Sequence, residues 1–163
     1  MDKDRCKLIL NSTPIAIYGL DLQGNCTFAN EACVRMLGYS CEGDFLGRNL
    51  HEMIHHTRKD GTPYLEAECK IYQAFRENKS THVDDEVLWR KDGTSFPAEY
   101  WSNQIRDGVG VVVGSVVTWV DISKRLELEA DILTSTKKQT NVLTKLREDI
   151  SVRIKAMKKD GCS

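Results

Sequence analysis

Short apolar runs separated by turn residues fill the first three quarters of the chain, and their spacing predicts short strands and helices. The apolar runs at residues 15–20 and 26–29 indicate a β-hairpin, because Gln23-Gly24-Asn25 forms a turn between them. Helical patterns follow at residues 30–37, ending at Gly38, and at residues 64–78. Residues 3–10 predict a short helix, which Pro14 separates from the hairpin.

Three longer antiparallel strands are predicted within residues 87–123, and Asp121-Ile122-Ser123 closes the last of them. The turn sequence Arg-Lys-Asp-Gly-Thr occurs twice, at residues 58–62 and 90–94. Asp-Gly supplies the positive-φ position that tight turns need. The second copy lies between apolar strands and predicts a hairpin. The first lies between helical patterns and predicts a loop.

Residues 124–160 predict one continuous helix, because they contain neither proline nor glycine. One heptad register places five apolar residues on a single seam: Ile132, Leu143, Leu146, Ile150 and Met157. Thr136, Gln139 and Arg153 weaken this seam. A helix this polar is marginal alone in water, so the pattern favours a parallel dimeric coiled coil. A helix folded back on its own domain is the alternative.

The composition fits one folded domain with an extension: the chain has 163 residues, of which 40% are hydrophobic and 29% charged. The six cysteines lack CxxC spacing, so we expect free thiols in a reducing, cytoplasmic setting. We expect no signal peptide and no membrane span. The basic residues beyond Ser123 alternate with acidic ones, which favours a solvated helix face over a nucleic-acid interface.

Taken together, several motifs in residues 5–125 resemble the PAS domain family. They are Pro14-Ile15-Ala16-Ile17, Asn30-Glu31-Ala32, Leu37-Gly38-Tyr39, Leu46-Gly47-Arg48, Arg90-Lys91-Asp92-Gly93-Thr94-Ser95-Phe96-Pro97 and Asp121-Ile122-Ser123. The resemblance implies an α+β fold, with a five-stranded antiparallel sheet, short helices on one face and a small cavity. It divides the chain into a lead-in helix (1–13), a PAS domain (14–123) and a signalling helix (124–161). It also implies that Asp121, Ile122 and Ser123 couple the sheet to that helix.

The resemblance also bears on cofactors. The light-sensing flavin branch of the family carries a cysteine directly after Gly-Arg-Asn, where this chain has Leu50. Its flavin-binding amides correspond here to Leu88, Ala98 and Trp119, which argues against FMN photochemistry. Haem would need an axial ligand, for which Cys69 is the candidate, although a buried small apolar residue is the simpler interpretation. The candidate cavity-lining residues are Ile17, Phe28, Leu50, Cys69, Leu88, Ala98 and Trp119.

His51-Glu52-Met53-Ile54-His55 matches HExxH, the pattern of zinc metalloproteases. His56 adds a third imidazole, and Glu66 and Glu68 are candidate third ligands. However, the segment is short, and it falls where a PAS domain has a helix of one or two turns. We therefore assign no catalytic residues and no metal, and keep a zinc metallohydrolase only as an alternative.

The sequence therefore predicts a non-catalytic sensory or interaction module. Such a module would couple an unknown small ligand or partner protein to a dimeric C-terminal helix. It would be the input part of a signal-transduction protein of the histidine kinase, diguanylate cyclase or transcription regulator type. The alternative is a haem- or flavin-binding redox or gas sensor.

Overall fold

The structure is a computed structural model that describes residues 3–77 and 79–160, with side chains described for residues 4–77 and 79–156. The chain divides into two units between Ser123 and Lys124. The first contains a sheet and short helices, and the second consists of one long helix.

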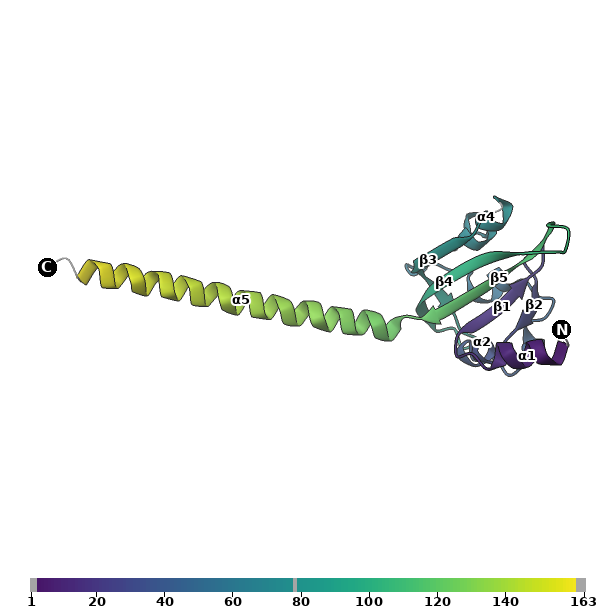
Figure 1. Ribbon diagram of the computed structural model, residues 1–163, viewed down its shortest axis with the longest axis horizontal. Coiled ribbons are helices and arrows are strands. Elements are labelled where there is room, and N and C mark those ends of the chain that lie inside the picture. The colour runs from purple at the N-terminus through teal and green to yellow at the C-terminus, as the bar shows by residue number, and fades with distance from the viewer. Residues whose placement is uncertain (1–2, 78, 161–163) are drawn as a thin grey trace. The chain divides into compact units, whose positions relative to one another are not determined.

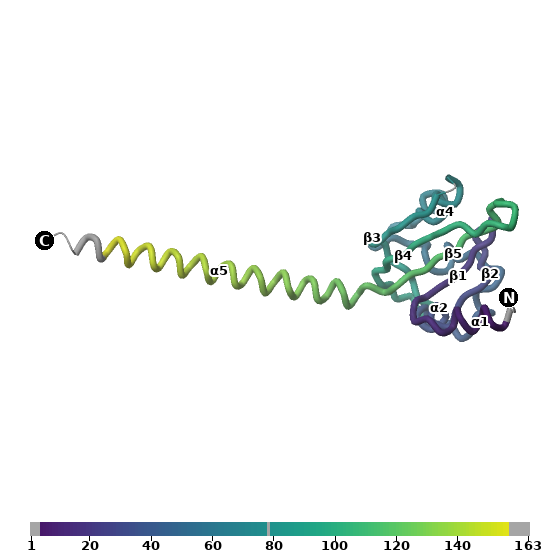
Figure 2. Tube along the Cα trace, viewed as in Figure 1, coloured from purple at the N-terminus to yellow at the C-terminus, as the bar shows by residue number. Residues whose placement is uncertain are grey.

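The first unit is built on a five-stranded sheet in which all neighbouring strands are antiparallel (Figure 1). Its strands are β1 (Ala16–Leu20), β2 (Cys26–Ala29), β3 (Thr81–Trp89), β4 (Ser95–Arg106) and β5 (Val112–Asp121). Their order across the sheet is β2-β1-β5-β4-β3. The last strand therefore lies in the middle, beside the first, as the trace in Figure 2 shows. This confirms the predicted fold class.

Short helices connect the strands, and a long helix ends the described chain. The helices are α1 (Lys3–Asn11), α2 (Glu31–Met36), α3 (Leu50–Ile54), α4 (Lys70–Arg76) and α5 (Ser123–Asp160), with 3-10 turns η1 (Glu42–Asp44) and η2 (Glu66–Glu68). The single helix predicted over residues 64–78 was wrong. Cys69 has an extended backbone (φ −62°, ψ 122°) and separates η2 from α4. The Tyr64 hydroxyl accepts a hydrogen bond from the Lys70 amide at this break (3.2 Å).

Strand β3 begins at Thr81, earlier than the predicted start at residue 87, and it contains a bulge. Val83 pairs with Tyr100 and Glu86 pairs with Ala98, so three steps along β3 oppose two along β4. A bulge of this kind changes which face of the sheet the following side chains occupy. Glu86 therefore shares the face of Val83 instead of lying opposite it.

The core lies on the sheet face that carries Tyr100, Ala98 and Trp119, all at most 1% exposed. The Asn30 side chain helps to position this sheet: its Oδ1 accepts hydrogen bonds from the Ile17 and Cys33 amides. Its Nδ2 donates to the carbonyls of Leu10 and Ile15 (2.9 and 2.8 Å). One buried amide thus joins α1, β1 and α2.

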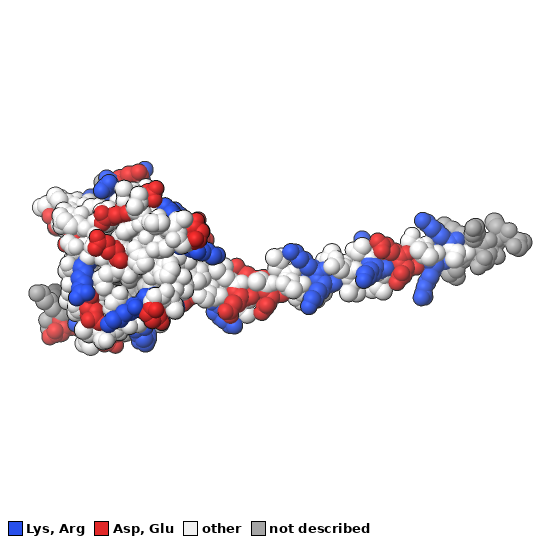
Figure 3. Space-filling view, turned by 180° about the vertical axis from the view of Figure 1, so that it is seen from behind, with Lys and Arg blue, Asp and Glu red and all other residues white. Residues whose placement is uncertain are grey.

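The long C-terminal helix α5 confirms the predicted extension. Four of the five predicted seam residues are exposed by half or more: Ile132, Leu143, Leu146 and Ile150. The side chain of the fifth, Met157, lies outside the described residues. Basic and acidic side chains alternate along α5 (Figure 3). No helix in the described part of the chain combines the length and apolar character needed to cross a bilayer.

Candidate functional site

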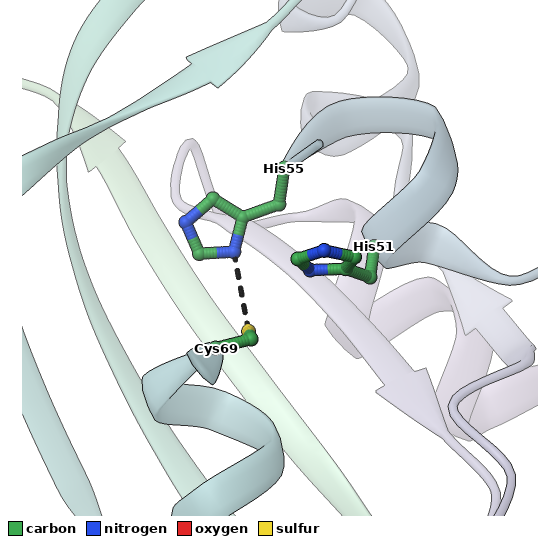
Figure 4. Close-up of side chains that lie close together, drawn as sticks. All are labelled: His51, His55 and Cys69. Carbon is green, nitrogen blue, oxygen red and sulfur yellow. Dashed lines mark hydrogen bonds between the residues drawn. The ribbon is translucent and has the colours of Figure 1, made fainter. Parts of the chain in front are cut away.

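Two histidines of the HExxH segment are buried, at 9% (His51) and 3% (His55) exposure. His51 lies in α3, and His55 follows one turn later as the C-cap of that helix; the Asn49 side chain caps the first turn of α3. Cys69, at 1% exposure, approaches both from the break before α4 (Figure 4). One ligand atom from each of the three side chains lies within 4.8 Å of the other two. The sequence pattern had given the two imidazoles but not the thiol.

The protonation of His51 follows from its contacts. Its Nε2 lies 2.7 Å from the Tyr64 carbonyl oxygen. A carbonyl oxygen only accepts hydrogen bonds, so Nε2 carries the hydrogen. The other nitrogen, Nδ1, is buried and finds no hydrogen-bond partner among the described residues. His51 Nδ1 therefore lies in the core without an aligned hydrogen bond, while burial lowers the pKa of His51 and the nearby Cys69 and the Tyr64 carbonyl outweigh it and raise that pKa.

His55 is held in a similar way. Its Nε2 lies 2.9 Å from Glu86 Oε2, and its Nδ1 lies 3.5 Å from Cys69 Sγ. Burial lowers the pKa of His55, but the hydrogen bonds to Cys69 and Glu86 and their negative charges raise it to about 9. His55 is therefore charged at neutral pH where Cys69 and Glu86 are ionised.

Cys69 is more than a small apolar core residue. Burial raises the pKa of its thiol, but the neighbouring His51 and His55 imidazoles outweigh burial and lower the pKa to about 6. The two imidazoles thus favour the thiolate form of Cys69 despite its burial. Cys26 and Cys33 differ, because burial raises the pKa of each thiol to about 12.

Glu86 is the partly buried anion behind this cluster, with a side chain that is 12% exposed. Its carboxylate accepts hydrogen bonds from His55, Tyr64 (2.9 Å) and Tyr100 (2.6 Å), and Lys70 Nζ lies 3.2 Å away. Burial raises the pKa of Glu86, but the bonds from His55, Tyr100 and Tyr64 and the charge of His55 lower it to about 2. The β3 bulge turns this carboxylate inward, so simple alternation along the strand does not reveal it.

The other candidate metal ligands lie outside the cluster. His56 is exposed; its Nδ1 bonds the Thr57 hydroxyl (2.6 Å) and its ring stacks on Trp89. Glu66 accepts from Asn49, and Glu68 pairs with Arg58. Glu52, which would be the base of a zinc hydrolase, is exposed while both imidazoles are buried. The geometry therefore does not fit the hydrolase alternative.

Five of the seven candidate cavity residues belong to one buried core cluster: Leu50, Cys69, Leu88, Ala98 and Trp119. The other two, Ile17 and Phe28, are half-buried, and the Phe28 ring lies beside Gly19, where it leaves no room for a Cβ atom. Ile17 and Gly19 alternate with the buried Ala16, Tyr18 and Leu20 along β1. Ile17 and Phe28 thus lie away from the core face.

The space around the histidines suits an ion and not an organic cofactor. A cavity bordered by Leu50, His51, His55 and Cys69 has a volume of about 10 Å³, close to the minimum for one water molecule. A haem bound through Cys69 does not fit this packing. A larger hollow of about 270 Å³ opens beside His55 and is lined by Arg58, Tyr64, Lys70 and Glu86, among others.

A second candidate site lies where β5 meets α5. The Asp121 carboxylate accepts from the Ser123 amide (2.9 Å) and hydroxyl (2.6 Å), which caps the start of α5. Its other oxygen accepts from Arg90 at 2.9 Å. Ile122, at 3% exposure, donates its amide to the Pro97 carbonyl (3.0 Å). Asp121 thus joins the turn before β4 to the start of α5 at Ser123, and Ile122 is bonded to β4. These are the three residues predicted to couple the sheet to the helix.

The family described as PAS fold matches residues 4–122 of this chain. The chain belongs to the PAS family. Among curated proteins, this PAS domain is 28% identical over 123 residues to the probable diguanylate cyclase DgcE of Escherichia coli (strain K12). That match covers 76% of this chain but spans only 11% of the relative's length.

Solved structures agree on the fold of this PAS domain. A PAS domain from Colwellia psychrerythraea has a TM-score of 0.59 at 22% identity, covering 75% of this chain and 97% of that one. An RNA-binding light-oxygen-voltage receptor has a TM-score of 0.61 at 20% identity, covering 85% of this chain and 38% of that one. The PAS domain of Bordetella pertussis BvgS has a TM-score of 0.53 at 20% identity, covering 82% and 96%.

Proposed function

We propose that this protein is a non-catalytic sensory module, in which the PAS domain passes a ligand- or partner-dependent change to a dimeric α5 helix. A downstream output domain or partner protein would then respond to the helix pair. The similarity to part of a diguanylate cyclase and to the PAS domain of a two-component sensor histidine kinase supports an input role. The described cysteines form no disulfide, which fits a reducing, cytoplasmic compartment.

The contacts of Asp121 carry this proposal. One carboxylate bonds both Arg90, in the turn between β3 and β4, and Ser123, the first residue of α5. A shift of the β3–β4 turn would therefore act on the group that caps the helix. Ligand binding can drive such a shift only if the ligand prefers one of the two arrangements.

The exposed seam of α5 supports the dimer. Leu143, Leu146 and Ile150 are 62%, 51% and 56% exposed in the single chain. A second copy in parallel would bury all three against their own equivalents.

The test uses the full chain with Leu146→Glu and Ile150→Glu together, and light scattering after gel filtration as the readout. Charges on the seam should convert a dimer into a monomer. Val152, also apolar and 66% exposed, lies two positions beyond Ile150 and off the seam, so Val152→Glu is the matched control. A wild-type monomer at high concentration, or equal dissociation by seam and control variants, would refute the coiled-coil dimer.

The coupling needs its own measurement. Asp121→Asn in the full chain should weaken the bond to Arg90 and the cap, and hydrogen exchange should accelerate in the first turns of α5. Asp131→Asn, further along the same helix, is the control. Unchanged exchange at the start of α5 in Asp121→Asn would show that Asp121 does not couple the two units.

A further inference from the structure

We propose that His51, His55 and Cys69 form a binding site for a zinc-type transition metal ion, and that this ion is the input of the sensor. The metal site stands on the geometry of these side chains alone. Only its role as the input rests on the proposed function.

The spacing of the three donors fits a tetrahedral metal. Zinc bonds nitrogen at about 2.0–2.1 Å and sulfur at about 2.3 Å, so a tetrahedral site places these two donors about 3.5 Å apart. His55 Nδ1 and Cys69 Sγ are 3.5 Å apart, and the donor set as a whole lies within 4.8 Å. The more widely spaced donors would have to approach one another from their present limit of 4.8 Å to complete the tetrahedral geometry.

The outer contacts match those that orient histidine ligands. A ligating imidazole usually donates its other N–H to a carbonyl or a carboxylate. His51 Nε2 donates to the Tyr64 carbonyl and His55 Nε2 bonds Glu86, which leaves the Nδ1 atom of each ring for the ion; His55 Nδ1 already contacts Cys69 Sγ. Figure 4 shows both rings on the side of the short helix α3 that faces Cys69.

The strongest observation is the unsatisfied nitrogen. His51 Nδ1 is buried and has no hydrogen-bond partner in the described part of the chain. Leaving a buried polar atom unpaired is destabilising, and a metal ion bonded to this nitrogen would remove that cost.

Charge and ligand chemistry select the class of ion. Imidazole and thiolate together favour zinc or copper over magnesium or calcium, which prefer oxygen donors. A ligating imidazole nitrogen carries no hydrogen, so binding of the ion would release the proton between His55 Nδ1 and Cys69 Sγ and leave a neutral His55 beside a Cys69 thiolate. Three protein ligands leave a fourth position for water, a small anion or a side chain.

The binding test uses the full chain, stripped of metal under reducing conditions and titrated with Zn²⁺. Native mass spectrometry should show one bound ion per chain. Cobalt substitution should give the near-ultraviolet charge-transfer band of a cobalt–thiolate bond. Cys69→Ser and His51→Gln should each weaken binding by more than the roughly 10–100-fold that loss of an outer partner costs. Glu86→Gln should fall within that 10–100-fold range.

Matched controls come from the same chain. His56→Gln removes the neighbouring imidazole that bonds Thr57, and Cys26→Ser removes a buried thiol outside the cluster. Both should bind zinc as tightly as the wild type. If either control loses binding while His51→Gln and Cys69→Ser retain it, the site is wrongly assigned.

A wild-type measurement keeps the test valid if a variant fails to fold. Stoichiometric Zn²⁺ should slow alkylation of Cys69 at least tenfold, measured peptide by peptide, while alkylation of the exposed Cys41 stays unchanged. Alkylation of Cys69 that is indifferent to zinc would overturn the metal site, and would leave a reactive imidazolium–thiolate pair in its place.

Hydrogen exchange tests whether zinc bound at this site is also the input of the sensor. Zinc should change the exchange of β3, β4 and the start of α5 in the wild type but not in Cys69→Ser. Zinc bound at Cys69 with no change in α5 would refute the ion as the input, while the dimer and the Asp121 junction would stand on their own tests.

Discussion

The two Arg-Lys-Asp-Gly-Thr turns have the same local structure at two different places. In the first, the Arg58 amide bonds the Thr62 carbonyl (2.8 Å), and Asp60 accepts from the Thr62 amide and hydroxyl. In the second, Arg90, Asp92 and Thr94 make the same three bonds. The first copy is therefore the loop predicted between helical patterns, and an isolated bridge between Thr57 and Pro63 gives it a hairpin-like form.

The two arginines, in contrast, have different surroundings. Arg58 lies 4.0 Å over the Tyr64 ring, pairs with Glu68 and borders the hollow beside His55. Arg90 lies 4.2 Å over the Phe96 ring and pairs with Asp121 at the start of α5. The five-residue sequence fixes the shape of each turn, and tertiary contacts decide what its arginine does.

The largest expected difference is between Arg90→Ala and Arg58→Ala. Arg90 also donates to the Met36 carbonyl (3.2 Å), and its side chain is 29% exposed, against 40% for Arg58. We expect Arg90→Ala to lower the free energy of unfolding by about 1.5–3 kcal/mol. Arg58→Ala should lower it by at most about 1 kcal/mol. Urea denaturation of the full chain measures both.

A double-mutant cycle sharpens this difference. Arg90 and Asp121 should show a coupling free energy of at least about 0.5 kcal/mol, whereas Arg58 and Glu68 should show almost none. Equal coupling in the two pairs would mean that the Arg90 contact has no special role at the junction.

The glycines of the two turns should behave alike. Gly61 and Gly93 have φ values of 86° and 81°, and a Cβ atom added at either would meet nothing within 4 Å. Gly→Ala should therefore cost about 1–2 kcal/mol at each, from backbone strain alone. Urea denaturation would contradict the shared local structure if one substitution were neutral and the other were not.

The two turns should differ least in the pKa values of their aspartates, Asp60 and Asp92. Hydrogen bonds from Thr62 lower the pKa of Asp60, and those from Thr94 lower the pKa of Asp92, both from 3.8. A lowered carboxyl pKa means that the stabilisation is present above pH 3.8 and is lost as the pH falls through the lowered value. Carboxyl NMR titration should give two similar values below 3.8. Thr62→Val and Thr94→Val should each raise only the value in their own turn.

Most of the fold could be predicted from the sequence, because turns and alternating patterns are local. The predicted element bounds were wrong where contacts between residues far apart in the sequence determine the backbone conformation. Nothing in the sequence interrupts the helical pattern at Cys69, yet the chain breaks there and turns the thiol toward α3. The start of β3 was missed because Asp84 and Asp85, both exposed at the bulge, do not alternate with apolar residues.

The candidate site could be predicted only in part. The spacing of His51 and His55 reveals a pair on one helix, but Cys69 is 14 residues from His55 and Glu86 is 31. No motif spacing joins residues brought together by a break before α4 and a bulge in β3. The exposed Glu52, in contrast, looked functional in the sequence only because it completes the HExxH pattern.

The bulge in β3 also affects how copies of this chain meet. An outer strand with unpaired backbone groups invites another strand to extend the sheet, a common start of aggregation. Here one outer strand is interrupted by the bulge, where the exposed Asp84 and Asp85 would repel an approaching copy. The other, β2, has only four residues, and Cys26 at its start already bridges to Leu46. Growth of the sheet from molecule to molecule is therefore disfavoured at both edges.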